Sequence, residues 1–177
     1  MTKRDAFATI TVFDANMGPP SVDALSQGVC MSSVTVVRGN RAIVDAVSFS
    51  VEPGTILGIL GPSGAGKSTI IKVLTTEYRP DGGYATIQGH DVASNPQIVK
   101  AMFGYVPQDL QLYENLTFLE NVLYFGAQYG IHDNSLRRRA VELARAVELE
   151  DRLNEQVKKM SGGQKKRVSI AVALAHN

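Results

Sequence analysis

The chain has 177 residues, an apolar fraction of 44% and a formal net charge of +1. This length fits one domain of ordinary size, and the composition is that of a globular protein rather than a disordered one. The balanced charge excludes a global basic field, so we expect no nucleic-acid partner.

The single cysteine, Cys30, excludes an internal disulfide and is typical of a reducing compartment. The three histidines lack the spacing of metal ligands, which argues against a zinc site. No run approaches the ~20 apolar residues that a membrane-spanning helix needs, so we expect no direct membrane insertion. The N-terminus also lacks the apolar stretch of a signal peptide.

Residues 1–30 read as an irregular extension outside the core. The cluster from Met17 to Ser21 contains Gly-Pro-Pro and breaks any regular element. A short strand is predicted over 8–13, and Cys30 is interpreted as a small apolar residue in a linker.

Regular structure is predicted from Ser33. Residues 33–37 and 43–51 are rich in valine and isoleucine and flank a Gly-Asn turn, which predicts two paired strands. The apolar run 55–60 shows no alternation, which predicts a strand buried on both faces. A glycine-rich loop and a helix over 67–76 follow it. Strand, glycine loop and helix form the opening unit of a nucleotide-binding α/β domain.

Helices are predicted after Leu110. Thr117 and Glu120 form a capping box that starts a helix reaching to about Tyr129 and stopping at Gly130. A second helix, capped by Asn134–Ser135, has an apolar stripe made of Leu136, Ala140, Leu143, Ala144 and Val147. A last helix is predicted to begin after Ser161 and to continue to the end of the chain. The arginine run 137–139 is either a solvated helix face or a partner contact.

An aromatic cluster follows Gln108 and comprises Tyr113, Phe118, Tyr124, Phe125 and Tyr129. We expect at least half of these rings to lie in the core, because aromatic side chains are usually buried. One or two should stay exposed around a groove near Gln108.

The sequence from Gly61 to Ser68 matches the phosphate-loop pattern G-x-x-x-x-G-K-[ST]. Its glycines let the backbone wrap phosphates, and its N–H groups and the following helix N-terminus favour negative charge. Lys67 is predicted to reach the β- and γ-phosphates, and the Ser68 hydroxyl to ligate Mg²⁺. A glycine-rich turn with a surface lysine is the alternative, and the strand–loop–helix context disfavours it. The predicted nucleotide contacts are Gly61, Pro62, Ser63, Gly64, Ala65, Gly66, Lys67, Ser68 and Thr69.

A second motif, Met160-Ser-Gly-Gly-Gln164 followed by basic residues, resembles the signature of the ABC ATPases. Ser161 can cap a helix, and two glycines let a ligand approach that helix end, where N–H groups favour an anion. The resemblance implies that Ser161, Gly162, Gly163 and Gln164 contact the ATP of a second subunit.

The resemblance to ABC ATPases covers residues 33–177. Residues 104–108 look like the family's Q-loop, so Gln108 is expected to contact Mg²⁺ or the attacking water. The implied fold class is α/β, an ABC-type P-loop NTPase core with an antiparallel β subdomain and an inserted helical subdomain. This fold would divide residues 31–177 into three parts. Residues 31–107 would contain the strands and the phosphate loop, residues 108–160 the Q-loop and the helical subdomain, and residues 161–177 the signature helix. Residues 107–117 most resemble exporters of drugs, lipids or polysaccharides.

Two departures from the family pattern stand out. Arg38 occupies the place of an aromatic residue that stacks on adenine, and it either stacks on the base through a cation–π contact or faces solvent. The sequence also contains no Asp-Glu pair, which in the family follows the signature helix, holds Mg²⁺ and polarises the attacking water. His176 is expected inside the signature helix and is not assigned the role of the family's switch histidine. The fold is therefore expected to be C-terminally incomplete.

The resemblance implies the ATP-binding subunit of an ABC transporter, with ATP and Mg²⁺ as cofactors. Its implied partners are a transmembrane subunit and a second ATP-binding domain in a head-to-tail dimer, which would place it on the cytoplasmic face of a membrane. Lys67 and Gln108 are its expected catalytic residues, yet these residues alone should hydrolyse ATP negligibly. The alternative is a truncated nucleotide- or partner-binding module without turnover. A soluble ABC ATPase of translation or DNA repair fits less well, and a P-loop kinase or GTPase does not explain Ser161 to Gln164.

Overall fold

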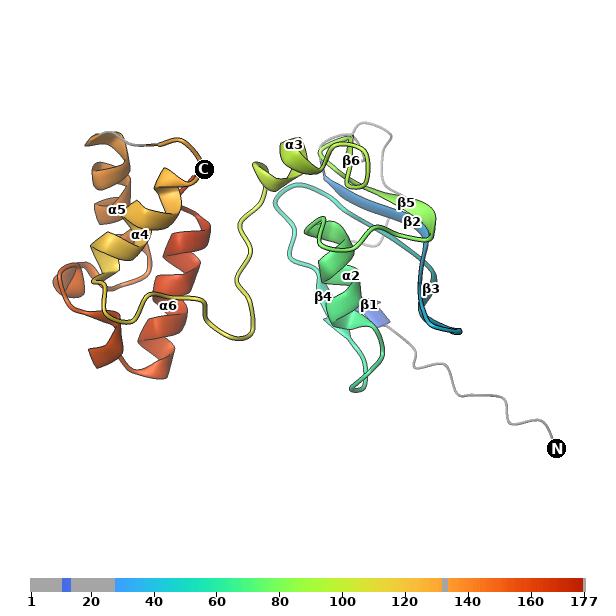
Figure 1. Ribbon diagram of the computed structural model, residues 1–177, viewed down its shortest axis with the longest axis horizontal. Helices are drawn as coiled ribbons and strands as arrows, with labels where there is room; N and C mark the ends of the chain where they lie inside the picture. The colour runs from blue at the N-terminus through green and yellow to red at the C-terminus, as the bar shows by residue number, and fades with distance from the viewer. Residues whose placement is uncertain (1–10, 14–27, 132–133, 177) are drawn as a thin grey trace. The chain divides into compact units, whose positions relative to one another are not determined.

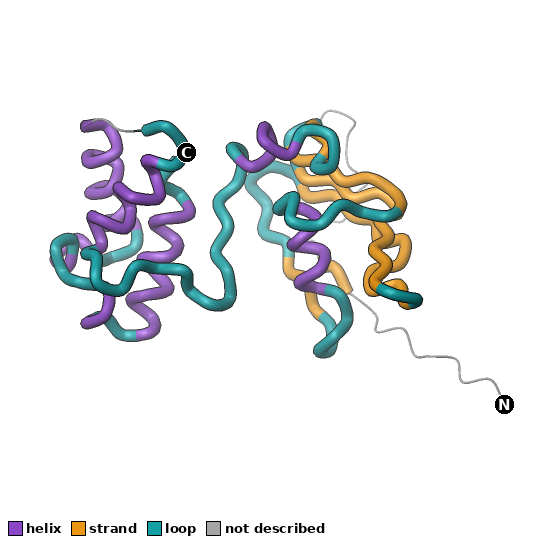
Figure 2. Tube along the Cα trace, viewed as in Figure 1, coloured by secondary structure: helices purple, strands orange, loops and turns teal. Residues whose placement is uncertain are grey.

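The computed structural model describes residues 11–13, 28–131 and 134–176. The chain divides into two compact units, residues 1–100 and residues 101–177 (Figure 1). In the described ranges the strands belong to the first unit, and the second unit is built of helices and turns (Figure 2). The predicted part boundary at 107/108 thus falls inside the second unit.

The first unit contains a four-stranded antiparallel sheet in the order β3-β2-β5-β6. Its strands are β2 (Val29–Arg38), β3 (Arg41–Val51), β5 (Gly82–Ile87) and β6 (His90–Asp91). A turn follows β5, with Gly89 in the left-handed region at φ 78°.

Cys30 lies inside β2, opposite Ser50 and Thr86, so its assignment to a linker was wrong. Strand β2 also begins before the predicted start at Ser33. Ser33 itself adopts φ 48° at a register shift of the β2–β3 pair, and such a bulge interrupts the pattern from which the strand was predicted. Partial burial raises the pKa of the Cys30 thiol.

Helix α2 (Lys67–Leu74) packs against β3 and β5 of the sheet. Its Ile70 and Val73 are buried, as are Val34 and Val36 on β2, and these side chains form the core of the first unit. The helix ends before the predicted Thr76, which adopts φ 63°. A short helix, α3 (Pro96–Lys100), closes the unit beside β6.

Strand β4 (Gly58–Leu60) precedes the phosphate loop and is shorter than the predicted 55–60. It pairs antiparallel with β1 (Thr11–Phe13), which lies in the strand predicted over 8–13; residues 8–10 fall outside the described residues. The prediction of burial on both faces was wrong, since Ile56 is 92% and Leu60 57% exposed. In the described part of the chain, β1 is the strand that pairs with β4, and a two-stranded ribbon cannot cover its own faces.

The second unit packs three helices around one core: α4 (Phe118–Ala127), α5 (Asn134–Ala146) and α6 (Gly162–Ala173). The 3₁₀ turns η1 (Glu150–Arg152) and η2 (Val157–Lys159) connect α5 to α6. The stripe predicted for α5 is confirmed: Leu136, Ala140, Leu143 and Ala144 are buried, and Val147 packs partly buried against them. The other buried core residues are Phe118, Leu119, Val122, Leu149, Val157, Met160, Val168, Ala171 and Ala175.

Two helices end earlier than predicted. Helix α4 stops at Ala127, and Gly130 beyond it adopts φ 80°, which suits a residue that ends a helix. Helix α6 ends at Ala173 with Leu174 as C-cap, so His176 lies past the helix and not within it. The His176 ring stacks on Tyr129 with centroids 4.0 Å apart, and this contact holds the turn after α6.

The capping box of α4 is confirmed. The Thr117 hydroxyl accepts a hydrogen bond from the Glu120 N–H at 3.1 Å, and the Glu120 carboxylate accepts one from the Thr117 N–H at 2.8 Å. The hydrogen bond from the Thr117 N–H lowers the pKa of Glu120. The stability that this contact contributes is therefore complete above the usual carboxylate pKa, and it is lost as the pH falls through the lowered pKa of Glu120.

Thr117→Ala is therefore expected to lower the free energy of unfolding of the second unit by about 1 kcal/mol, because one first-turn N–H loses its acceptor. Urea unfolding followed by the helical circular dichroism signal measures this. Thr117→Ser keeps the acceptor and should stay close to the parent. Equal stability of Thr117→Ala and the parent would contradict the role of the cap.

Candidate nucleotide-binding site

The phosphate loop connects β4 to α2, and close packing against β3 requires a glycine at its last glycine position, Gly66. Gly66 adopts φ 95°, in the left-handed region, and a Cβ added there would lie 2.6 Å from the carbonyl oxygen of Ile43 on β3. A side chain is therefore excluded twice, by conformation and by contact. Strand β3 consequently fixes where the loop turns into α2.

The N-terminus of α2 is open to an anion. Gly66 is the N-cap residue and has no side chain to accept the first-turn N–H groups, and the first turn contains no acidic residue. Those N–H groups have no intrahelical acceptor, and the helix dipole adds positive potential at the same place. Ala65 is buried, whereas Ser68 is exposed beside this end. The arrangement fits a phosphate group, which needs donors and positive charge.

The Lys67 side chain contacts the backbone at the start of the phosphate loop. Its Nζ donates to the carbonyl oxygens of Gly61 at 2.8 Å and Pro62 at 2.7 Å. The ammonium is thus held over the loop by the loop's own backbone, next to the first-turn N–H groups. An ammonium at the phosphate loop can donate charge-assisted hydrogen bonds to phosphate oxygens.

The signature motif forms the start of α6 in the second unit. Ser161 is the N-cap, as predicted: its hydroxyl accepts from the Gln164 N–H at 3.3 Å, and the Gln164 side chain accepts from the Ser161 N–H at 2.8 Å. Apart from the chain neighbours and the backbone of α6 itself, no atom of the described residues lies within 4 Å of a Cβ added at Gly162 or Gly163. The helix end is therefore approachable, which is what the two glycines predicted.

The Q-loop segment runs along α6. A Cβ added at Gly104 would lie 2.2 Å from the carbonyl oxygen of Ala173, and Lys166 Nζ donates to the Pro107 carbonyl at 3.2 Å. The preceding residue, Lys165, forms an ion pair with Glu114, with Nζ and Oε1 2.6 Å apart. Gln108 itself is exposed beyond these contacts. Sequence reasoning missed both lysines as anchors, because their partners lie far away along the chain.

The aromatic cluster is more exposed than expected. Tyr113, Tyr124 and Tyr129 are exposed, Phe125 is half-buried and only Phe118 among the five is buried, so the expectation of a mostly buried cluster was wrong. The buried face of α4 is made by Phe118, Leu119 and Val122, which leaves the other rings outside. The Tyr113 and Tyr124 hydroxyls lie 3.1 Å apart, and Phe125 packs against both rings.

Arg38 lies at the end of β2 and does not simply face solvent. Its guanidinium carbon lies 4.4 Å from the centroid of the Tyr78 ring, and its Nη1 lies 3.8 Å from the Asp81 carboxylate. Sequence reasoning did not find Tyr78, because nothing in its local pattern points to the end of a distant hairpin.

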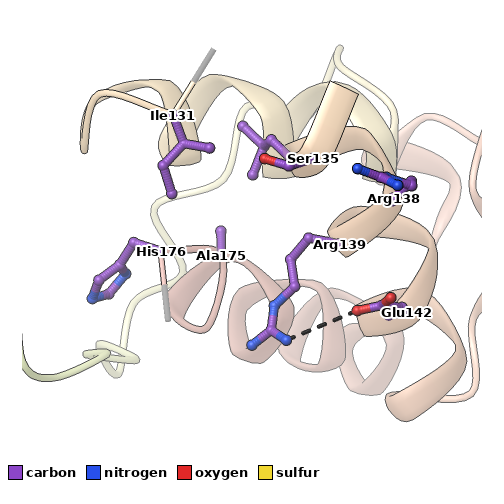
Figure 3. A pocket seen from close by; sticks show the side chains of 8 residues that line it. Ile131, Ser135, Arg138, Arg139, Glu142, Ala175 and His176 are labelled. Atoms are coloured by element: carbon purple, nitrogen blue, oxygen red, sulfur yellow. Dashed lines mark ion pairs between the residues drawn. The ribbon is translucent and has the colours of Figure 1, made fainter. Parts of the chain in front are cut away.

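A pocket of about 390 Å³ lies in the second unit between α5 and the turn after α6 (Figure 3). It is lined by Ile131, Ser135, Leu136, Arg138, Arg139, Glu142, Ala175 and His176. Arg139 pairs with Glu142 at 3.9 Å and is half-buried, whereas Arg137 and Arg138 are exposed as a solvated face would be. Burial lowers the pKa of His176. None of the residues predicted to bind nucleotide lines this pocket.

Two negative findings apply to the described ranges. No helix there is long and apolar enough to cross a membrane. No group of three or more His, Cys, Asp or Glu side chains there could hold a metal ion.

Comparison with known proteins identifies the family. Residues 44–177 match the family model described as ABC transporter, so the chain belongs to this family. ABC ATP-binding domains bind ATP and are ATPases.

Curated relatives agree. The chain is 37% identical to the linearmycin resistance ATP-binding protein LnrL of Bacillus subtilis (strain 168), over 78% of this chain and 44% of that protein. It is 41% identical to the daunorubicin/doxorubicin resistance ATP-binding protein DrrA of Streptomyces peucetius, over 80% and 42%. The Nod factor export ATP-binding protein I of Rhizobium etli is 35% identical, over 82% and 46%. The chain thus spans less than half the length of these relatives.

Solved structures confirm the P-loop NTPase fold of the ABC type. An ATP-binding subunit of an ABC transporter matches with a TM-score of 0.68 and 26% identity, over 85% of this chain and 62% of that one. An ATP-binding cassette of an ABC transporter matches with a TM-score of 0.70 and 23% identity, over 85% and 66%, and supports the fold alone.

Proposed function

We propose that the chain is the nucleotide-binding part of an ABC exporter's ATP-binding subunit, and that it binds Mg-ATP at the phosphate loop. The observation that carries this proposal is the open N-terminus of α2 with the Lys67 ammonium held beside it. The exporter assignment is supported by the relatives, which are named for linearmycin resistance, daunorubicin/doxorubicin resistance and Nod factor export.

The roles of individual residues follow from their chemistry. The first-turn N–H groups of α2 and Lys67 would hold phosphate oxygens, with residues 61–66 as the backbone cradle. The exposed Ser68 hydroxyl is the proposed Mg²⁺ ligand of the loop, and Thr69 follows it in the first turn. Gln108 is proposed to contact Mg²⁺ or the attacking water, as the family resemblance implies. Bound Mg-ATP would supply the phosphoryl group.

The proposed partners are a second ATP-binding domain and a transmembrane subunit. Ser161 to Gln164 would face the ATP of the second domain, because the N-terminus of α6 is approachable and is flanked by basic residues. The exposed rings of Tyr113 and Tyr124, backed by Phe125, are the proposed contact for the transmembrane subunit. These partners would place the protein on the cytoplasmic face of a membrane.

We further propose that these 177 residues bind nucleotide without sustained turnover. Phosphoryl transfer in P-loop enzymes needs Mg²⁺ held by the loop hydroxyl and by a further aspartate, together with a group that orients water. The sequence contains no Asp-Glu pair to supply the second aspartate and its neighbouring glutamate. The alternative, a natural binding module, predicts the same behaviour of this chain.

Incubation with Mg-ATP is therefore expected to give equilibrium binding but no phosphate release above the protein-free rate. Fluorescence titration with an ATP analogue measures the binding, and a coupled phosphate assay measures the release. Absence of binding would contradict the proposed function. Steady release that disappears in Lys67→Ala would contradict the absence of turnover, because the chain would then complete its site by another route.

A further inference from the structure

The Arg38 guanidinium is held in one place by three neighbours. Besides lying over the Tyr78 ring, its Nη1 donates to the Val37 carbonyl at 2.8 Å and faces the Asp81 carboxylate. Asp81 is itself fixed, since its carboxylate accepts from the Val37 N–H at 2.7 Å. A half-exposed arginine at the end of a hairpin would otherwise sample many rotamers. These contacts favour one orientation, in which the guanidinium carbon lies within cation–π distance of the Tyr78 ring.

The Tyr78 ring is anchored to the helix that begins at the phosphate loop. The Tyr78 N–H donates to the Lys72 carbonyl at 2.9 Å, at the C-terminal end of α2. The Lys72 ammonium lies 5.0 Å from the same ring and pairs with Glu77 at 2.9 Å, and this hydrogen bond raises the pKa of Lys72. Two cationic side chains, Arg38 and Lys72, therefore lie close to the Tyr78 ring, and the ring keeps a fixed place relative to α2.

The hairpin end and the phosphate loop belong to one packed unit. Arg38 is paired with Arg41 across the β2–β3 hairpin, and Ile43, further along β3, is the residue against which Gly66 packs. At a rise of about 3.3 Å per residue, Ile43 lies roughly 7 Å along the strand from Arg41. A ribose and base extending from phosphates at the loop can cover such a distance. The Arg38 side chain is 48% exposed, so it is open to contact with a ligand.

We propose that Tyr78 is a positioning residue that holds the Arg38 guanidinium in place, so that the face of the guanidinium away from Tyr78 stacks on the base of the bound nucleotide. This inference rests on the proposed nucleotide binding and adds the residue that makes Arg38 effective there. Guanidinium planes stack on aromatic faces, and every nucleobase offers such a face. Tyr78 contacts the arginine and not the ligand.

The test distinguishes the contribution of the base to binding from that of the phosphates. Titration calorimetry with ATP and with inorganic tripolyphosphate is carried out on the full chain and on Tyr78→Leu, Tyr78→Phe and Tyr84→Leu. Tyr78→Leu should weaken ATP binding by about threefold to fivefold, the value of one exposed cation–π contact, and leave tripolyphosphate binding unchanged. Tyr78→Phe keeps the ring and should restore ATP binding. Tyr84, an exposed tyrosine of the same unit, is the matched control and should have no effect.

A spectroscopic arm covers the case in which Tyr78→Leu fails to fold. The chain has no tryptophan, so Tyr78→Trp introduces a single indole that keeps an aromatic face under Arg38. Its emission should change on adding ATP and not on adding tripolyphosphate. Equal responses to both ligands, or equal loss of both affinities in Tyr78→Leu, would overturn the positioning role while leaving nucleotide binding intact. If the parent chain binds neither ligand, the proposed function itself fails.

Discussion

Lys67→Ala is expected to lower the affinity for ATP by roughly tenfold to a hundredfold, the value of losing one charge-assisted hydrogen bond of about 1.5–3 kcal/mol. The Lys67 ammonium is the cation that the structure holds directly over the loop, through the Gly61 and Pro62 carbonyls. The uncapped first turn of α2 remains in the variant, so residual binding through N–H groups should persist. Equilibrium titration with a fluorescent ATP analogue measures both affinities.

Lys100→Ala is the matched control for this variant, because Lys100 belongs to the same unit, carries the same charge and is exposed at the end of α3. It should leave the affinity within about threefold of the parent, since surface charges far from the ligand contribute little. Ser68→Ala should cause a smaller loss than Lys67→Ala, and only when Mg²⁺ is present. Unchanged affinity in Lys67→Ala would remove the basis for assigning residues 61–68 as a phosphate site.

Phe118→Ala is expected to destabilise the second unit by about 3–5 kcal/mol, the usual cost of deleting a fully buried phenylalanine ring. Phe118 is 0% exposed and is the largest side chain of this core, at the first position of α4. Removing the ring would leave a cavity in the core that α4, α5 and α6 share. Chemical denaturation followed at the helical circular dichroism band measures the loss.

Tyr124→Ala is the control on the same helix, because its ring is exposed and packs mainly on Tyr113 and Phe125. It should cost about 1 kcal/mol or less, the value of an aromatic pair at a surface. If both variants lost the same stability, the division of α4 into a buried and an exposed face would be wrong. If neither did, the core of the second unit would lie elsewhere.

The sequence by itself determined the features that are local and chemically strict. A phosphate loop needs small residues and a lysine at fixed spacing, so residues 61–68 could be identified without coordinates. The caps at Thr117 and Ser161 were predictable for the same reason, because an N-cap and its partner lie within one helical turn. The apolar stripe of α5 followed from helical periodicity alone.

Only the tertiary structure decided which distant residues meet. The pairing of Arg38 with Tyr78, and of Lys166 with the Pro107 carbonyl, joins segments that local patterns cannot relate. Burial was also decided at this level: an apolar run such as 55–60 is buried only where another element covers it, and Ile56 in the described structure is exposed. Periodicity predicts which face of an element is apolar, whereas packing determines what that face touches.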